Sequence, residues 1–217
     1  DLGLEEQVVG HRVAIEQLRE LALAELLLDL VERQHAKVAL LLVLAEELAG
    51  RWDVPLIRVQ HHHAHVAACM VEHGITGEVL GIAWDGAGYG IDGSLWGGEF
   101  LAVTYGDCRR VAHLHPFALP GGEQAAREPR RASLSVRWET FGAQPGGVGV
   151  EQEYGWKEQE QLLVAMLTRR THSPITTSMG RLFDAVASML GLCQVATFEG
   201  QAAMALEQEA LKTSPSL

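Results

Sequence analysis

Four histidines lie within five consecutive positions, in the run QHHHAH at residues 60–65. Neutral imidazole is a common metal ligand, whereas four charged rings so close together would repel one another. Residues four apart share one face of a helix, so His61 and His65 can bind the same ion. We expect His62 and His63 to point elsewhere, where either could bind substrate or a phosphate. A polar helix start or a chance run is the alternative, but this density of histidines favours a metal site.

A glycine-rich segment, IAWDGAGYG at residues 82–90, follows an apolar run. Glycines let the backbone approach a phosphate and direct amide hydrogens at it, so Gly86, Gly88 and Gly90 are candidate nucleotide-binding residues. Asp85 stands where the strand should end and can bind a cation that bridges to phosphate. The alternative is a plain hairpin loop with positive φ angles. The spacing matches neither the Walker phosphate loop nor the dinucleotide fingerprint.

A third motif, TTSMGRLFD at residues 176–184, has the pattern of a capped helix start. Ser178 can cap the helix, and Gly180 would allow a ligand close to an end whose dipole favours anions. Asp184, one turn later, could reach a ribose hydroxyl. Glu199, in the run FEGQ before the last expected helix, could reach the same cleft. An ordinary core helix is the alternative.

A fourth motif combines LPGG at residues 119–122 with REPRR at residues 127–131. Its arginines could hold an anionic group through paired hydrogen bonds. A solvated, charged helix face explains the same residues equally well.

The elements that must position these residues follow from periodicity and turn residues. Residues 4–50 predict helix, with a second helix over 37–48 that Gly50 would stop. We expect a strand over 54–59, a helix over 61–73 stopped by Gly74, and a hairpin with strands over 78–84 and 99–105 and a glycine-rich connection over 85–98. Residues 109–116 predict a further strand. Helices are expected after Pro129 up to 141 and over 154–170, 178–190 and 201–211, and the stretch 143–150 is the best linker candidate.

Composition excludes several classes of protein. The 217 residues are 47% hydrophobic and 21% charged, which favours a globular domain over disorder or a membrane bundle. The net charge of −11 argues against a free-standing nucleic-acid binder. Three separated cysteines without a CxxC pair predict reduced thiols, and no signal peptide or membrane span is evident, so we expect a cytoplasmic location.

Taken in order, the runs VQHHHAH, DGAGYGIDGSLWGGE, LPGGEQAAREPRR, TTSMGRLFDAVASMLGL and FEGQAAM resemble the carboxyl-terminal catalytic region of the HypF hydrogenase-maturation carbamoyltransferase family. The O-carbamoyltransferases that include TobZ share this region. The resemblance covers about residues 54–207 and fades before them. It implies an α/β fold, actin-like and ribonuclease-H-like, of the sugar kinase and heat-shock ATPase superfamily. We therefore expect a helical lead-in over 1–53 and a truncated, amino-terminal part of the catalytic domain over 54–217.

The resemblance also implies an ATP-dependent reaction. Carbamoyl-adenylate, formed from carbamoyl phosphate and ATP, would give its carbamoyl group to the carboxyl-terminal cysteine of a HypE-type acceptor, in cyanide-ligand synthesis for nickel–iron hydrogenase. His61, His65 and Asp85 would bind a divalent metal, iron or zinc, with magnesium a further candidate. Asp85 and His62 would be catalytic, and Gly86, Gly88, Gly90, Gly180, Asp184 and Glu199 would bind nucleotide. The family has a further aspartate ligand with no matching position here.

Two alternatives stay open at this point. The first is an O-carbamoyltransferase acting on a small hydroxyl compound, which the four motifs do not separate from the HypF family. The second is a non-catalytic, actin-like module that holds nucleotide as a structural ligand. Neither alternative involves nucleic acid or a membrane.

Overall fold

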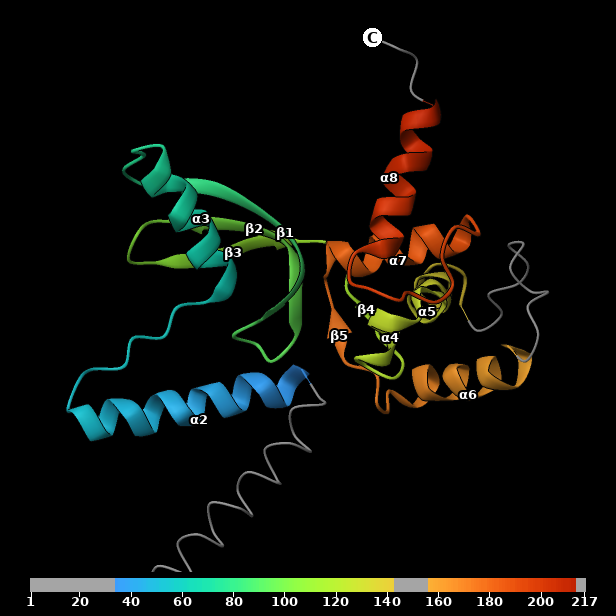
Figure 1. The fold of residues 1–217 in the computed structure, drawn as a ribbon, viewed down its shortest axis with the longest axis horizontal. Helices are drawn as coiled ribbons and strands as arrows, with labels where there is room; N and C mark the ends of the chain where they lie inside the picture. The colour runs from blue at the N-terminus through green and yellow to red at the C-terminus, as the bar shows by residue number, and fades with distance from the viewer. Residues whose placement is uncertain (1–33, 143–155, 214–217) are drawn as a thin grey trace, which may run out of the picture. The chain divides into compact units, whose positions relative to one another are not determined.

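The computed structural model describes residues 34–142 and 156–213 (Figure 1). The contacts divide the chain into two compact units, Asp1–Arg58 and Val59–Leu217. The sequence placed the start of the catalytic domain at residue 54. The helix expected over residues 4–33 and the linker expected over 143–150 lie outside the described residues.

The described part of the first unit is one helix, α2 (Gln34–Trp52). The helix continues through Gly50, so the prediction that this glycine stops it is wrong. It ends instead at Asp53, which has a φ of 51°, and the amide of Val54 donates to the carbonyl of Ala49 at 3.1 Å. A helix ends where the backbone turns left-handed, and here the aspartate makes that turn. Among the described helices, none is long and apolar enough to cross a membrane.

Residues 54–59 form no strand, contrary to the sequence prediction. Their β-branched side chains are exposed, including Ile57 at 80% and Val59 at 55%. A strand needs a neighbour to take its backbone hydrogen bonds. In the described part of the chain, no strand pairs with this segment.

A five-stranded mixed sheet forms the centre of the second unit. Its strands are β1 (Val79–Tyr89), β2 (Leu95–Val103), β3 (Cys108–His113), β4 (Phe117–Ala118) and β5 (Ile175–Thr176). β2 is the shared strand: β1 and β3 pair with it antiparallel, and β5 pairs with it in parallel at Leu95↔Thr176. β4 then pairs antiparallel with β5. The sheet thus joins the β1–β2 hairpin to a segment that lies far along the chain.

The β1–β2 hairpin is longer than the sequence predicted. β1 runs through the glycines to Tyr89, so the expected connection over 85–98 is wrong. The turn itself covers residues 90–94, closed by the bond from the Gly90 amide to the Ser94 carbonyl at 2.9 Å. The register moves from Trp84↔Gly98 to Gly88↔Trp96, which leaves three β1 residues opposite one β2 residue. This β-bulge interrupts the ladder at Asp85 and Gly86.

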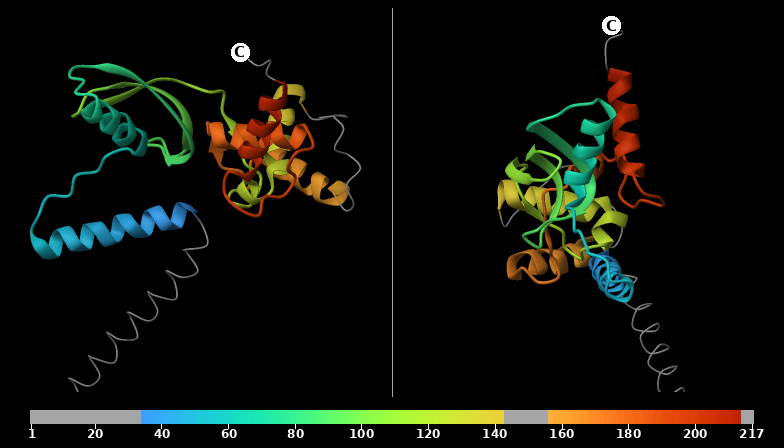
Figure 2. Two further views of the ribbon diagram at one scale, coloured as in Figure 1. Left: turned by 45° about the horizontal axis from the view of Figure 1, so that its top comes forward. Right: turned by 90° about the vertical axis from the view of Figure 1, so that its left-hand side faces the viewer.

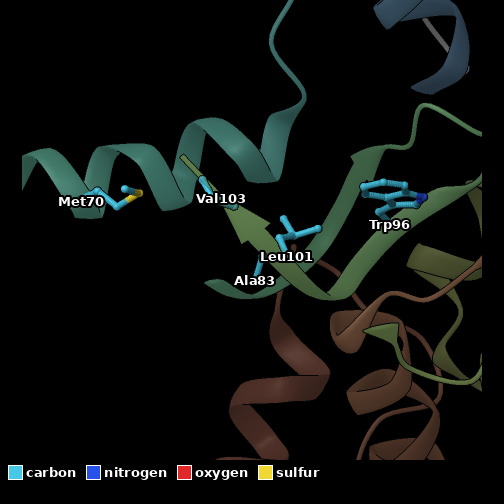
Figure 3. Packing of buried hydrophobic residues seen from close by; sticks show 5 residues of the cluster. All are labelled: Met70, Ala83, Trp96, Leu101 and Val103. Atoms are coloured by element: carbon cyan, nitrogen blue, oxygen red, sulfur yellow. The ribbon is translucent and has the colours of Figure 1, made fainter. Parts of the chain in front are cut away.

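Helix α3 (His61–Glu72) covers one face of the hairpin (Figures 1 and 2). The side chain of Met70, on this helix, is buried together with Ala83, Leu101, Val103 and Trp96 from the strands (Figure 3). Val66 lies directly over β1, where a Cβ on Gly81 would come within 2.5 Å of its methyl group. The helix and the sheet therefore approach closely, which fixes the start of α3 beside the bulge.

Helices make up the rest of the second unit: α4 (Gln124–Arg127), α5 (Pro129–Phe141), α6 (Trp156–Arg169), α7 (Met179–Met189) and α8 (Gln201–Thr213). α7 packs against α5 and α8 and also against β1. Phe117, Leu119, Ala132 and Ala185 form one apolar cluster in this part. The bounds of α5 to α8 agree with the sequence prediction to within a few residues.

Candidate functional site

The candidate site begins at the amino-terminal end of α3. Gln60 caps this helix, because its side-chain oxygen accepts a hydrogen bond from the His63 amide at 3.0 Å. The cap places His61 in the first turn and His65 one turn later. The Nε2 atoms of these two residues lie 3.1 Å apart. The helical spacing thus brings both imidazoles to one point.

Asp85 reaches the same point from the bulge of β1. Its Oδ2 lies 2.9 Å from Nε2 of His61 and 3.6 Å from Nε2 of His62. Its Oδ1 accepts a hydrogen bond from the amide of Gly86 at 2.6 Å. A regular strand would alternate its side chains between the two faces, so the bulge is what re-aims this carboxylate.

The charges of the cluster suit a cation. Burial raises the pKa of the Asp85 carboxyl, but the Gly86 amide and His61 outweigh it, so the pKa lies below its usual value. Burial lowers the pKa of His62, so this ring is neutral at pH 7. A carboxylate with imidazoles is a donor set that divalent transition metals bind.

Two overlapping ligand sets are available. One ring nitrogen each of His61 and His62 and a carboxylate oxygen of Asp85 all lie within 4.8 Å of one another. His65 is the other candidate, through its contact with His61. The sequence favoured the set with His65, whereas proximity in the structure favours the set with His62, because no group of three ligand atoms within 4.8 Å among the described residues includes His65.

The structure corrects the expected orientation of His62. Its side chain is completely buried and points into the cluster, not elsewhere. Its ring is stacked on Trp96, with centroids 6.4 Å apart and planes at 11°. His63 does point away, and its Nε2 donates to the carbonyl of Thr104 at 2.8 Å. His63 therefore fastens α3 to the end of β2 and is not placed to bind substrate.

Two of the candidate nucleotide-binding glycines have a clear packing role. A Cβ on Gly88 would lie 2.5 Å from the His62 ring, and one on Gly90 would lie 2.1 Å from the Trp96 ring. These glycines make room for the two stacked rings. Gly86 is different, because the nearest atom to its Cβ position is Nη2 of Arg181 at 3.9 Å. Of the three, Gly86 is the one whose Cβ position meets no close contact, since 3.9 Å is an ordinary van der Waals distance.

The start of α7 lies against the bulge. Ser178 caps this helix by accepting from the Arg181 amide at 3.0 Å, and its hydroxyl donates to the Gly86 carbonyl. A Cβ on Gly180 would lie 2.9 Å from Cα of Gly86. The amino terminus of α7, an end that favours negative charge, therefore lies beside the imidazole and carboxylate cluster.

The other two predicted nucleotide-binding residues differ in their surroundings. Asp184 is buried in α7 with its Oδ2 2.7 Å from Nη1 of Arg181. Burial raises the pKa of this carboxyl to about 6, although Arg181 partly opposes the change. Glu199 is exposed before α8. Among the described contacts, none joins Glu199 to the rest of the site.

A buried ionic network that the sequence motifs did not predict lies beside the cluster. Glu99 on β2 is completely buried, and Arg110 on β3 donates to it at 2.6 Å. The same arginine contacts Asp92 at 3.1 Å and lies 4.2 Å over the Trp96 ring. Arg110 stands at an ordinary strand position, so the sequence gives no signal that it forms a buried ion pair. The glutamate at the end of the run WGGE, Glu99, could have suggested a buried carboxylate.

Two family models and several known proteins match the chain. The family model "Carbamoyltransferase, Kae1-like Domain, second subdomain" matches residues 81–216, and the model "HypF Kae1-like domain" matches residues 14–72. The carbamoyltransferase HypF of Synechocystis sp. is 45% identical over 179 residues, with 76% of this chain and 23% of that protein covered. The probable carbamoyltransferase HypF of Methanocaldococcus jannaschii is 35% identical over 164 residues, with 76% and 21% covered.

Two solved structures resemble the chain. A full-length HypF in the phosphate- and nucleotide-bound form has a TM-score of 0.65 at 41% identity, with 71% of this chain and 24% of that chain covered. The HypF of T. kodakarensis has a TM-score of 0.72 at 36% identity, with 80% and 24% covered. The chain thus spans about a quarter of the length of these relatives. Their likeness confirms the predicted α/β, actin-like and ribonuclease-H-like fold class.

Proposed function

Because this chain belongs to the HypF carbamoyltransferase family, we propose that it forms part of the site that transfers a carbamoyl group in hydrogenase maturation. The group would pass from carbamoyl-adenylate, made from carbamoyl phosphate and ATP, to the carboxyl-terminal cysteine of a HypE-type acceptor. The observation that carries the proposal is that Nε2 of His61 lies 3.1 Å from Nε2 of His65 and 2.9 Å from Oδ2 of Asp85.

In this proposal, His61, His65 and Asp85 hold a divalent metal, iron or zinc. Two imidazoles and one carboxylate leave further positions for a substrate oxygen, as catalytic metal sites require. When bound, the metal would anchor and polarise an anionic or carbonyl oxygen. The depressed pKa of Asp85 keeps this carboxylate charged for that purpose.

The nucleotide would lie where the bulge meets α7. The uncrowded Cβ position of Gly86 and the amino terminus of α7 support a phosphate there. A HypF relative whose structure is described as phosphate- and nucleotide-bound supports nucleotide binding in this family. Gly180 would act by allowing this close approach, and Asp184 would face the ribose. Glu199 has the least support, since it is exposed and no described contact joins it to the site.

The transfer itself needs little from the protein beyond positioning. The acceptor sulfur forms a bond to the carbamoyl carbon, the bond from that carbon to the phosphate oxygen breaks, and AMP leaves with the electron pair. The thiol proton passes to solvent. Asp85 and His62 would be the catalytic residues in contact with the reacting group, and backbone amides near Gly86 would stabilise charge on the departing phosphate.

A cytoplasmic location stays a prediction. It was based in part on the expectation of reduced thiols, and the three cysteines that the structure describes are free.

A chimaera tests this function. Residues 59–217 of this chain would replace the matching segment of the Synechocystis carbamoyltransferase, which supplies the remaining regions. We expect the chimaera to add one carbamoyl group to the HypE-type acceptor in the presence of ATP and carbamoyl phosphate, judged by intact-protein mass spectrometry. The same chimaera with Asp85→Asn should add none. A folded chimaera that never modifies the acceptor, or an Asp85→Asn chimaera that modifies it fully, would refute the proposal.

A further inference from the structure

His62 is a buried side chain with an unsatisfied nitrogen. The side chain has no exposed surface, and within residues 34–142 and 156–213 its Nε2 has no hydrogen-bond partner. The Trp96 ring lies parallel to it, and the Gly88 backbone comes so close that a Cβ there would lie 2.9 Å from Nε2. These neighbours hold the ring so that Nε2 faces Oδ2 of Asp85, 3.6 Å away. Buried polar atoms are normally paired, so an unpaired one that faces a site indicates a missing partner.

The hydrogen bonds of Gln60 decide which nitrogen of His62 carries the hydrogen. Oε1 of Gln60 accepts from the His63 amide, which can only donate. The other end of the side chain, Nε2, is therefore the NH₂ group, and it donates to the Tyr89 carbonyl at 3.3 Å. This same NH₂ group lies 3.2 Å from Nδ1 of His62. Since an amide nitrogen only donates, Nδ1 must be the acceptor, and the ring hydrogen is on Nε2.

We propose that Gln60 is a positioning residue that fixes His62 as the Nε2–H tautomer. His62 then faces the site as a hydrogen-bond donor to a substrate oxygen and not as a metal ligand, because a protonated nitrogen has no lone pair for a metal. This assigns the metal to His61, His65 and Asp85 and excludes the set with His62. The inference rests on the proposed function and deepens it. The oxygen could belong to a phosphate or to a carbamoyl group, which share this acceptor chemistry.

The tautomer can be measured without activity. In protein with ¹⁵N-labelled histidine, the two ring nitrogens of a neutral imidazole have distinct shifts. The His62 signals are assigned by their disappearance in His62→Gln. We expect Nε2–H in the metal-free wild type, and the same form after zinc is added. The proposal would be overturned if wild-type His62 carried its hydrogen on Nδ1. It would also be overturned if added zinc moved the ¹⁵N chemical shifts of His62 to values typical of a metal-bound ring.

Gln60→Glu separates positioning from a structural role. The carboxylate keeps an oxygen for the His63 amide but offers only acceptors to Nδ1, so the hydrogen should move to Nδ1. We expect the ¹⁵N chemical shifts of His62 to change from those of the Nε2–H form to those of the Nδ1–H form, while the circular dichroism spectrum stays unchanged. Gln201→Glu, the same change on α8, should leave the His62 signals as in the wild type. An unchanged tautomer in a folded Gln60→Glu variant contradicts the proposal.

Zinc content gives an independent test. His62→Gln should retain the wild-type zinc content, whereas His65→Gln should lose it, as measured by elemental analysis after dialysis. The reverse result would make His62 the ligand and overturn the proposal, while the metal site itself would stand. Absence of zinc from the wild type would instead contradict the proposed function, and the tautomer measurement on metal-free protein would still decide this inference.

Discussion

Nε of Arg110 donates to the buried carboxylate of Glu99 at 2.6 Å, which ties β3 to β2. The same carboxylate accepts from the amide of Gly97 at 3.1 Å and from the hydroxyl of Thr177, just before α7. One buried carboxylate therefore holds together three segments that border the candidate site. Burial alone would raise the pKa of Glu99, but these donors hold it below its usual value.

Glu99→Gln should destabilise the protein by about 2–3 kcal/mol, because it removes the buried one of the two carboxylates that pair with the partly buried Arg110 guanidinium. Urea unfolding followed by circular dichroism measures this free energy. Asp107→Asn, at an exposed position on the turn before β3, is the matched control and should change stability by less than about 0.5 kcal/mol. Equal stability of Glu99→Gln and the control would show that the network contributes little.

Gly180→Ala should lower the melting temperature, although alanine normally favours a helix by about 1 kcal/mol. The added Cβ would lie 2.9 Å from Cα of Gly86, and backbone cannot move aside as a flexible side chain can. Gly86→Ala is the contrast, because its Cβ would meet only Arg181 at 3.9 Å. We expect Gly86→Ala to keep the wild-type melting temperature and to weaken ATP binding in calorimetry. Stabilisation by Gly180→Ala would show that α7 does not press on the bulge.

The lowered pKa of Glu128 predicts that the protein loses stability in acid. Burial raises the pKa of this carboxyl, but Gln124, Arg131 and Arg130 outweigh it and lower the pKa to about 2. The folded value is thus below the ordinary 4.5, so the stabilisation is complete above pH 4.5 and disappears as the pH falls towards 2. We expect Glu128→Gln to cost about 1–2 kcal/mol near neutral pH, after allowance for solvent screening of the arginines, and nothing near pH 2.

The measurement for Glu128 is thermal unfolding as a function of pH. Glu139→Gln, at an exposed position of α5, is the control and should follow the wild-type curve. A Glu128→Gln curve parallel to the wild type would count against the assignment. These contacts also concern the motif REPRR, whose arginines were expected to be able to hold an anionic group. Arg130 and Arg131 already bind a carboxylate of this chain, that of Glu128.

The raised pKa of Asp184 predicts the opposite dependence of stability on pH. Its folded-state pKa of about 6 lies above the ordinary 3.8, so the folded protein binds this proton more tightly than the unfolded chain. Stability should therefore rise as the pH falls through 6 and level off below 3.8. Asp184→Asn removes the buried charge, so its melting temperature should exceed that of the wild type by about 3 °C or more at neutral pH. The difference should vanish near pH 4, and a lower melting temperature at neutral pH would contradict this account.

The sequence alone determined the parts of the site that depend on local spacing. His61 and His65 meet because residues four apart share a helix face, and Ser178 caps α7 because its hydroxyl reaches an amide in the same turn. The motifs were also sufficient to predict the family and the fold class. These features need only a few neighbouring residues, so they can be predicted without knowledge of the rest of the fold.

Tertiary structure decided everything that depends on a partner far along the chain. Residues 54–59 have strand-like composition, but none of the described strands lies beside them, so they are not a strand. The bulge that turns Asp85 towards the histidines arises from a register between two strands, and register is a property of the pair. His62 points inward because Trp96 and Gly88 receive its ring, and Arg110 joins the site because β3 lies beside β2. Packing between distant segments, which local periodicity does not encode, fixed these side chains.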